Sequence, residues 1–233
     1  MLKLVIFDMD GLMFDTEAVM YRAYLEVTAE NGYQGSKEQF ISLLGLNSAS
    51  VCKKYREYYG PEVNAEALYR MGGERKIQIL KREGIPVKKG LMELLSAIER
   101  LGIKKAVASS SDEDMIMDNL ADAGLSGRFD YILSARGMKR GKPFPDIFLK
   151  VCEKLNVKPE EALVLEDSEN GVRAAMAGGI PVIQIPDLVE LPEELRQECF
   201  AVKPSLDQVI PLLYSIRGVS AAGPSDDRGV TGH

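Results

Sequence analysis

Hydrophobic and polar positions form alternating helix-like and strand-like patterns from about residue 87 to residue 216. The predicted strands are short apolar runs at 3–7, 105–109, 131–134, 162–166 and 181–185. The predicted helices between them occupy 89–101, 112–123, 144–155, 169–178 and 205–216. Apolar runs without alternation are typical of strands covered on both faces. The pattern therefore predicts a doubly wound parallel sheet.

The segment 15–86 has a different pattern, with apolar spacings of three and four and no convincing strand. It predicts helices over 16–31, 37–44, 48–59 and 64–82. Because the first strand finds partners only after residue 100, this helical segment must be an insertion. The expected fold class is α/β: a Rossmann-like doubly wound parallel sheet core with an inserted all-helical cap domain.

The predicted domain boundaries follow from this insertion. The core comprises 1–14 and 87–217, the cap comprises 15–86, and 218–233 is expected to be a mobile, disordered tail because it lacks aromatic residues. Gly84 and Pro86 interrupt the helical pattern where the chain would return to the core.

Composition narrows the possible functions. With 45% hydrophobic and 27% charged residues among 233, the chain is typical of a soluble enzyme. A net charge of -6 argues against a nucleic-acid surface, and the sequence contains no evident membrane span or signal peptide. We therefore expect a cytoplasmic protein, monomeric, without nucleic-acid or membrane partners. The single histidine, His233, excludes a Ser-His-Asp triad and a histidine metal site in the folded body.

Two carboxylates, Asp8 and Asp10, follow the first predicted strand. Ligands collect at the carboxyl ends of strands in open α/β sheets. Carboxylates one residue apart repel each other, and a cation with a preference for oxygen ligands, such as Mg²⁺, would relieve that repulsion. An acidic turn ending in Gly11 is the alternative explanation.

Serines and a lysine follow two further strands. Ser109, Ser110 and Ser111 precede a predicted helix, where hydroxyl and backbone N–H groups can bind an anion. The alternative is that Ser111 or Asp112 caps that helix. Lys142 precedes Pro143 in a rigid bend and could pair with phosphate and carboxylates, although a solvated basic turn is the more common arrangement.

A second acidic pair, Glu166 and Asp167, ends the strand at 162–166. Capping of the next helix by Asp167 or Ser168 explains part of this segment. It does not explain two adjacent carboxylates on a buried strand end opposite Asp8. A shared cation explains both pairs.

The order of these motifs, Asp-x-Asp-Gly, Ser, Lys-Pro and Glu-Asp-Ser, resembles the haloacid dehalogenase superfamily over residues 1 to about 216. The helical insertion after the first motif is similar to the subgroup of phosphoglycolate phosphatases and β-phosphoglucomutase-like proteins. Dehalogenases of the superfamily lack the second aspartate, so Asp10 favours phosphoryl transfer.

The resemblance implies a role for each core residue. Asp8 would be the nucleophile that forms an aspartyl-phosphate. Asp10 would be the general acid and base, and its backbone carbonyl would bind Mg²⁺. The remaining implied contacts are of two kinds: phosphate oxygens would bind Ser109, Ser110 and Lys142, and the metal would bind Asp8, Asp10, Glu166 and Asp167.

The resemblance does not identify the substrate. We expect a phosphatase acting on a small phosphorylated metabolite, such as a sugar phosphate. A hexose-phosphate mutase is the alternative, but Met20 stands where such mutases usually have a cap histidine, and the loop 43–48 lacks their arginine. A non-catalytic phospho-accepting signalling module is a third possibility. Residues of the cap that could reach the site are Tyr21, Asn47, Arg75 and, as the predicted substrate contacts, Glu17 and Lys76.

Overall fold

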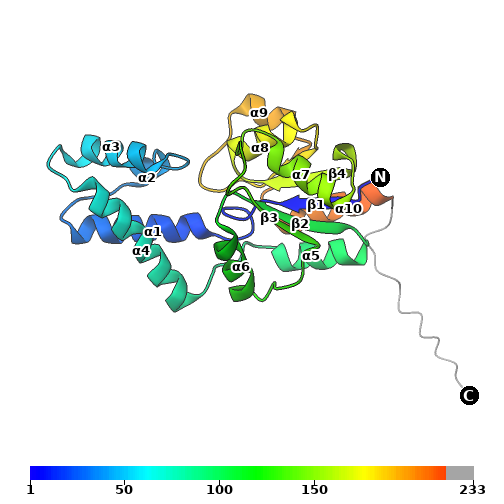
Figure 1. Ribbon diagram of the computed structural model, residues 1–233, viewed down its shortest axis with the longest axis horizontal. Helices are drawn as coiled ribbons and strands as arrows, with labels where there is room; N and C mark the ends of the chain where they lie inside the picture. Colours follow the sequence, from blue (N-terminus) through cyan, green and yellow to red (C-terminus); the bar gives the residue numbers. More distant parts are fainter. Residues whose placement is uncertain (219–233) are drawn as a thin grey trace, which may run out of the picture.

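The computed structural model describes residues 1–218, and the remainder of the predicted tail lies outside the described residues. Six parallel strands form one sheet in the order β3-β2-β1-β4-β5-β6 (Figure 1). Their bounds are β1 Leu4–Phe7, β2 Lys104–Ser109, β3 Tyr131–Ser134, β4 Ala162–Glu166, β5 Val182–Gln184 and β6 Ala201–Val202. The predicted α/β fold class with a doubly wound parallel sheet is confirmed.

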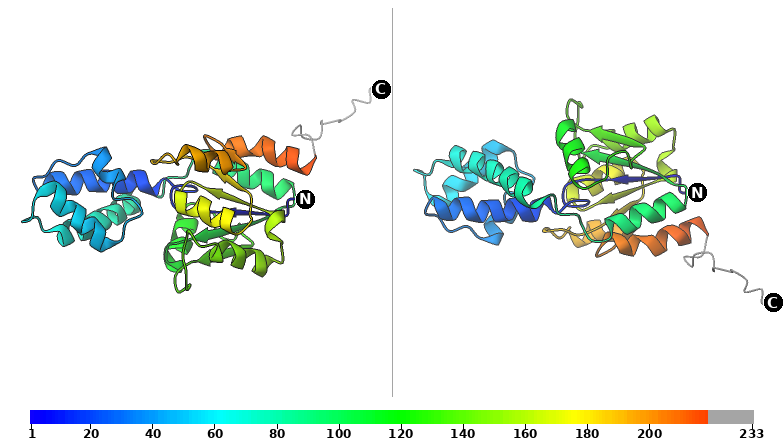
Figure 2. Two further views of the ribbon diagram at one scale, coloured as in Figure 1. Left: turned by 90° about the horizontal axis from the view of Figure 1, so that it is seen from above. Right: turned by 90° about the horizontal axis from the view of Figure 1, so that it is seen from below.

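Both faces of the sheet are covered by helices (Figure 2). Side chains alternate across a strand, so Val5 and Phe7 of β1 pack into one hydrophobic cluster and Leu4 and Ile6 into the other. The first cluster includes residues of α5 (Leu91–Arg100), α6 (Glu113–Asp122) and α10 (Ile210–Arg217). The second includes residues of α7 (Asp146–Leu155), α8 (Glu169–Ala177) and α9 (Glu193–Glu198). Burial on both faces explains the continuous apolar runs.

Four helices between β1 and α5 form a separate lobe, seen at the left of Figure 1. They are α1 (Thr16–Glu30), α2 (Lys37–Ile41), α3 (Ser48–Tyr59) and α4 (Ala65–Glu83). This lobe has its own hydrophobic cluster, built around residues such as Tyr24, Phe40 and Tyr55. It occupies the segment predicted to be the cap.

Two chain segments join the lobe to the sheet, and they pair with each other. The N–H of Asp15 donates to the carbonyl of Pro86 at 2.9 Å, and the N–H of Lys88 donates to the carbonyl of Met13 at 2.9 Å. We call these paired segments, 13–15 and 86–88, the hinge. The pairing fixes where α1 starts relative to the end of β1.

Several elements differ from the sequence-based expectations. The sequence pattern does not predict the strand β6, the helix α9 or the short 3-10 turn at Pro159–Glu161, because none is long enough to show a period. The helix predicted over 205–216 begins as a 3-10 turn, Leu206–Val209, before α10. Helix α7 begins at Asp146 rather than Phe144, since Pro145 is its N-cap residue. Within residues 1–218, no helix is both long and apolar enough to cross a membrane.

Candidate active site

The ends of β1, β2 and β4 bring the predicted site residues to one edge of the sheet. Phe7 pairs with both Val107 and Leu165, so the residues that follow these three strands lie at similar heights. The chain passes from β1 to one side of the sheet and later returns to the other side at β4. Ligands bind at such a switch point in open α/β sheets.

Lys142 connects two of the carboxylates. Its Nζ lies 2.5 Å from Asp8 Oδ1 and 2.5 Å from Glu166 Oε1, and its side chain is only 7% exposed. Burial alone would lower the pKa of Lys142, but the negative charges of Asp8 and Glu166 outweigh burial and raise it. The lysine therefore stays cationic inside the site.

Glu166 is fully buried and its oxygens are occupied. Besides Lys142, it accepts hydrogen bonds from the N–H groups of Asp167 and Ser168 at 3.0 and 2.9 Å, and from the Ser168 hydroxyl at 3.0 Å. Ser168 also caps α8 through the N–H of Gly171, as the sequence suggested. Glu166 thus holds Lys142 in place from the side opposite Asp8.

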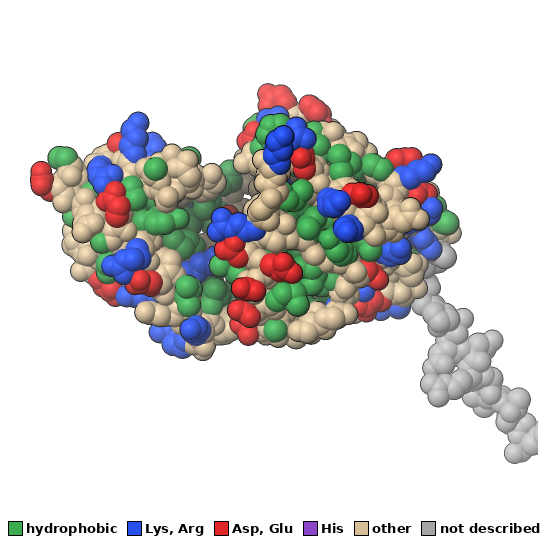
Figure 3. Space-filling view, in the orientation of Figure 1, with side chains coloured by type: hydrophobic (Ala, Val, Ile, Leu, Met, Phe, Trp, Pro, Cys, Tyr) green, Lys and Arg blue, Asp and Glu red, His purple; other side chains and the backbone are tan. Residues whose placement is uncertain are grey.

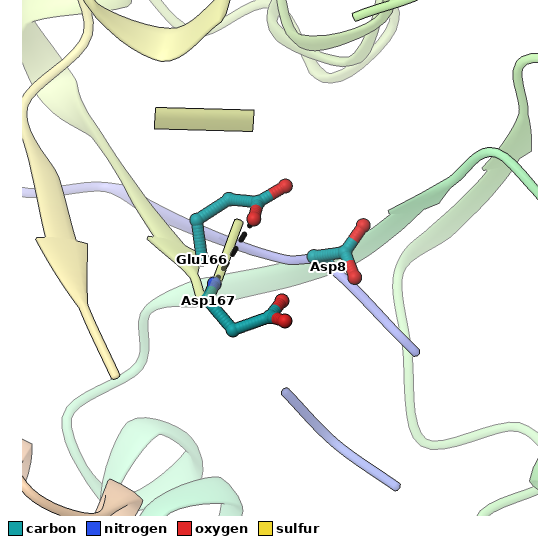
Figure 4. Close-up of side chains that lie close together, drawn as sticks. All are labelled: Asp8, Glu166 and Asp167. Atoms are coloured by element: carbon teal, nitrogen blue, oxygen red, sulfur yellow. Dashed lines mark hydrogen bonds between the residues drawn. The ribbon is translucent and has the colours of Figure 1, made fainter. Parts of the chain in front are cut away.

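Three carboxylates, Asp8, Glu166 and Asp167, offer oxygens within 4.8 Å of one another and surround a common space (Figure 4). Asp167 Oδ1 is buried and has no hydrogen-bond partner among the described residues. Burial, followed by the charges of Glu166 and Asp8, raises the pKa of Asp167 well above its usual range. Burial also raises the pKa of Asp8 to about 7, against the opposing charge of Lys142. This excess of negative charge around an orphaned oxygen fits a divalent cation.

The Asp10 side chain lies outside this group of three carboxylates and is held by two hydroxyls. Thr16 at the start of α1 donates to Oδ1 and Ser111 donates to Oδ2, both at 2.7 Å. Asp112 is the N-cap residue of α6, as one of the two alternatives expected, but its side chain makes no capping hydrogen bond. Asp112 pairs with Arg136, and Ser111 contacts Asp10.

Ser109 and Ser110 lie where an anion could reach them. Ser109 is buried, and its hydroxyl accepts a hydrogen bond from the N–H of Ser111 at 3.0 Å, which leaves the hydroxyl proton for a ligand. Ser110 is exposed beside it. Both serines and Lys142 line the same cavity.

The cavity has a volume of about 710 Å³ and lies between the helical lobe and the sheet, at the notch visible in Figure 3. Among the predicted cap contacts, only Glu17 lines it; Lys76 does not. The three other candidates have local roles: Arg75 pairs with Glu26 and Glu30, Asn47 caps α3, and Tyr21 packs on Phe40.

Sequence reasoning missed several residues that line the cavity. Leu44 and Gly45 come from the helical lobe, and the loop after β5 contributes Asp187, Val189 and Leu191. Asp187 could have been found, because it lies two residues after the predicted strand 181–185, close to where Asp8 and Asp167 stand after theirs. The others carry no chemical signal that distinguishes them from packing residues.

Glu17 gives a testable pH dependence. Burial raises its pKa from 4.5 to about 7, with further contributions from the charges of Asp187 and Asp10. Between these values the folded protein binds more protons than the unfolded chain, so ionisation of Glu17 lowers the free energy of unfolding as pH rises toward 7. Without metal at pH 8, Glu17→Gln should raise the free energy of unfolding by about 1 kcal/mol, reduced for solvent screening, which raises the melting temperature by about 2–4 °C.

The measurement is thermal unfolding in EDTA at pH 8 and pH 5. At pH 5 the side chain at position 17 is uncharged in both folded proteins and only the unfolded wild-type chain is ionised, so most of the difference in melting temperature should disappear. Equal melting temperatures of the two proteins at pH 8 would contradict the prediction, because they would show that ionisation of Glu17 does not lower the free energy of unfolding.

The class of this enzyme follows from comparison with known proteins. Residues 5–185 match the sequence profile of the haloacid dehalogenase-like hydrolases. The chain belongs to that family and is an enzyme of its phosphatase class, as the order of motifs indicated.

Individual relatives cover most of the chain. The phosphorylated carbohydrates phosphatase of Thermotoga maritima is 31% identical over 179 residues, which is 77% of this chain and 82% of that protein. Fructose-1-phosphate phosphatase YqaB of Escherichia coli (strain K12) is 28% identical over 78% of this chain and 95% of its own. A crystal structure of CbbY from Rhodobacter sphaeroides with xylulose-(1,5)bisphosphate has a TM-score of 0.71 at 25% identity, covering 90% and 96% of the two chains.

Proposed function

We propose that this protein is a Mg²⁺-dependent phosphatase that hydrolyses a small sugar phosphate through an aspartyl-phosphate on Asp8. The observation that carries the proposal is that Asp8 pairs with Lys142 and lies close to the carboxylates of Glu166 and Asp167. An oxygen of Asp8 attacks the phosphorus atom as the bond to the ester oxygen breaks; water then attacks the same phosphorus atom, the bond to Asp8 breaks, and inorganic phosphate is released. Attack by the carboxylate oxygen divides hydrolysis into two displacements, each with a lower barrier than direct attack by water.

The residues around Asp8 would each support these displacements. Lys142 and the hydroxyl of Ser109 would bind the phosphoryl oxygens, and the lysine would offset their charge. Asp10 would give a proton to the leaving alkoxide and later take one from water. Asp8, the backbone carbonyl of Asp10 and Asp167, with Glu166 beside it, would hold Mg²⁺, which supplies charge neutralisation between the carboxylate and the phosphate.

The cavity supports a sugar monophosphate as substrate. Among the described residues that line it, Lys142 is the only cation, and Asp8 and Glu166 already balance its charge. A second phosphate or a carboxylate on the substrate would therefore find no free cation in the cavity lining and would be repelled by the negative charges of Glu17 and Asp187. Sugar hydroxyls are donors for such carboxylates. The names of the two phosphatase relatives support the same substrate class.

A panel of phosphorylated metabolites tests the proposal. The purified protein is incubated with Mg²⁺ and either fructose 1-phosphate, both anomers of glucose 1-phosphate, phosphoglycolate or a sugar bisphosphate. Phosphate release and sugar-phosphate isomerisation are followed together. Release of phosphate from the monophosphates supports a phosphatase. Isomerisation of the sugar phosphate without phosphate release would instead support the hexose-phosphate mutase. A long-lived acyl-phosphate without turnover would favour the signalling module.

Metal removal should affect both activity and stability. In EDTA we expect phosphate release to fall at least about 100-fold and to return when Mg²⁺ is added, because the transferring charge would face Asp8 without a counter-ion. Mg²⁺ at about 100 times its dissociation constant should also stabilise the fold by about 2.7 kcal/mol, measured as a rise in melting temperature. Full activity in EDTA would contradict the metal requirement.

A further inference from the structure

Asp187 lies beside the carboxylates that would bind the metal, although it belongs to none of the sequence motifs. It stands in the loop that follows β5, and its side chain is only 8% exposed. It lines the same cavity as Asp8 and Asp167. The next residue, Leu188, packs against the hydrophobic cluster of the helical lobe. The loop therefore contacts the metal site and the lobe through adjacent residues.

Gly11 locates Asp187 relative to Asp167. A Cβ atom on Gly11 would overlap Asp167 Oδ2 and would lie 3.2 Å from Asp187 Oδ2. Both carboxylate oxygens thus lie against the same backbone position. Gly11 also has a φ of +83°, a conformation that side chains rarely adopt, so a glycine suits this position on both grounds.

The two oxygens of Asp187 have different surroundings. Oδ1 pairs with the ammonium group of Lys88, which also lies 3.5 Å from Asp15 Oδ1. Lys88 and Asp15 both belong to the hinge, so this ion pair fixes the loop to the hinge. Oδ2 is buried and has no hydrogen-bond partner among the described residues. A buried carboxylate oxygen without a donor is costly, which indicates that a ligand supplies one.

We propose that Asp187 is a positioning residue for the cation: its Oδ2 accepts a hydrogen bond from the cation's hydration water, while Lys88 holds its Oδ1. The inference rests on the Mg²⁺ site of the proposed function. Mg²⁺ keeps several of its waters when proteins bind it, and those waters are donors that need acceptors. Partners in the outer shell of a metal site typically change its affinity 10–100-fold.

Glu17 is the competing partner for Asp187, because its carboxyl group lines the same cavity and lies within hydrogen-bonding reach of that side chain. In that arrangement a proton on Glu17, rather than a hydrated cation, would satisfy Asp187. The two arrangements differ in what removal of each side chain does to metal binding. A contact with the cation's water makes Asp187 important for Mg²⁺ and Glu17 much less so.

Isothermal titration calorimetry with MgCl₂, at pH 7.5 and 0.15 M KCl, tests the proposal without turnover. Asp187→Asn should raise the dissociation constant at least about tenfold. Glu17→Gln should change it by less than about threefold. Glu66→Gln is the matched control, since Glu66 is an exposed carboxylate paired with Arg56 in the helical lobe.

The rise in melting temperature on Mg²⁺ addition, measured on the same proteins, gives a second readout. Asp187→Ser replaces Asp187→Asn if the asparagine variant does not fold.

Each outcome is decisive. Binding by Asp187→Asn within about twofold of the wild type would overturn the proposal. Equal weakening by Asp187→Asn and Glu17→Gln would also overturn it, because that pattern reports the total charge of the cavity. Wild-type protein that binds no Mg²⁺ would instead contradict the proposed function. Selective weakening by Asp187→Asn supports the contact.

Discussion

Asp8→Asn is expected to abolish phosphate release while the protein stays folded. The amide keeps the shape of the carboxylate but cannot attack phosphorus, so kcat should fall by about 10⁴-fold or more. Burial raises the pKa of Asp8 to about 7, which means that its charge is unfavourable in the folded protein without metal. Removal of that charge should therefore leave the melting temperature unchanged or higher in EDTA.

The measurement is steady-state phosphate release with saturating Mg²⁺, together with thermal unfolding in EDTA. Asp122→Asn is the matched control, because Asp122 is exposed at the end of α6, does not line the cavity and should keep full activity. Turnover by Asp8→Asn within tenfold of the wild type would rule out Asp8 as the nucleophile. Loss of both turnover and folding would leave a structural role, which the melting curve would reveal.

Much of the fold could be predicted because the strands are buried on both faces. Leu4 and Ile6 point to one cluster and Val5 and Phe7 to the other, so the strand has no polar side and its apolar run is unmistakable. The two-residue strand β6 is too short to give such a signal. It forms because it extends the sheet beside β5, a tertiary reason that no local pattern records.

The core of the site could also be predicted, because its residues directly follow strands whose ends meet at one edge. The hydrogen-bond partners of Asp10 could not be predicted. Thr16 and Ser111 are separated from it by 6 and 101 positions, and a hydroxyl beside the start of a helix is more simply interpreted as a helix cap. Which cap residues reach the cavity depends on how the lobe sits on the hinge. Lys76 and Glu17 are equally plausible in sequence, but only Glu17 lines the cavity.

Gly171→Ala should destabilise the protein and impair catalysis, although it changes a helical glycine to the best helix former. A methyl group at this position of α8 would overlap the carboxylate of Glu166, which is fully buried and can move aside only by giving up its hydrogen bonds. Displacement of Glu166 would loosen its contacts with Lys142 and with the N–H of Ser168. We expect a loss of about 3 kcal/mol in the free energy of unfolding and a fall of about 100-fold in kcat.

Gly73→Ala is the control for Gly171→Ala, since it introduces the same methyl group in a different helix. Gly73 lies within α4, and a Cβ there would meet no atom within 4 Å. Only the higher helix propensity of alanine then matters, so the free energy of unfolding of this variant should rise by about 0.5–1 kcal/mol, and its activity should be unchanged. Urea unfolding and phosphate release, measured on both variants, separate the two effects. If Gly171→Ala also gains stability, Glu166 tolerates the added methyl group, and the expected displacement of Glu166 from Lys142 does not occur.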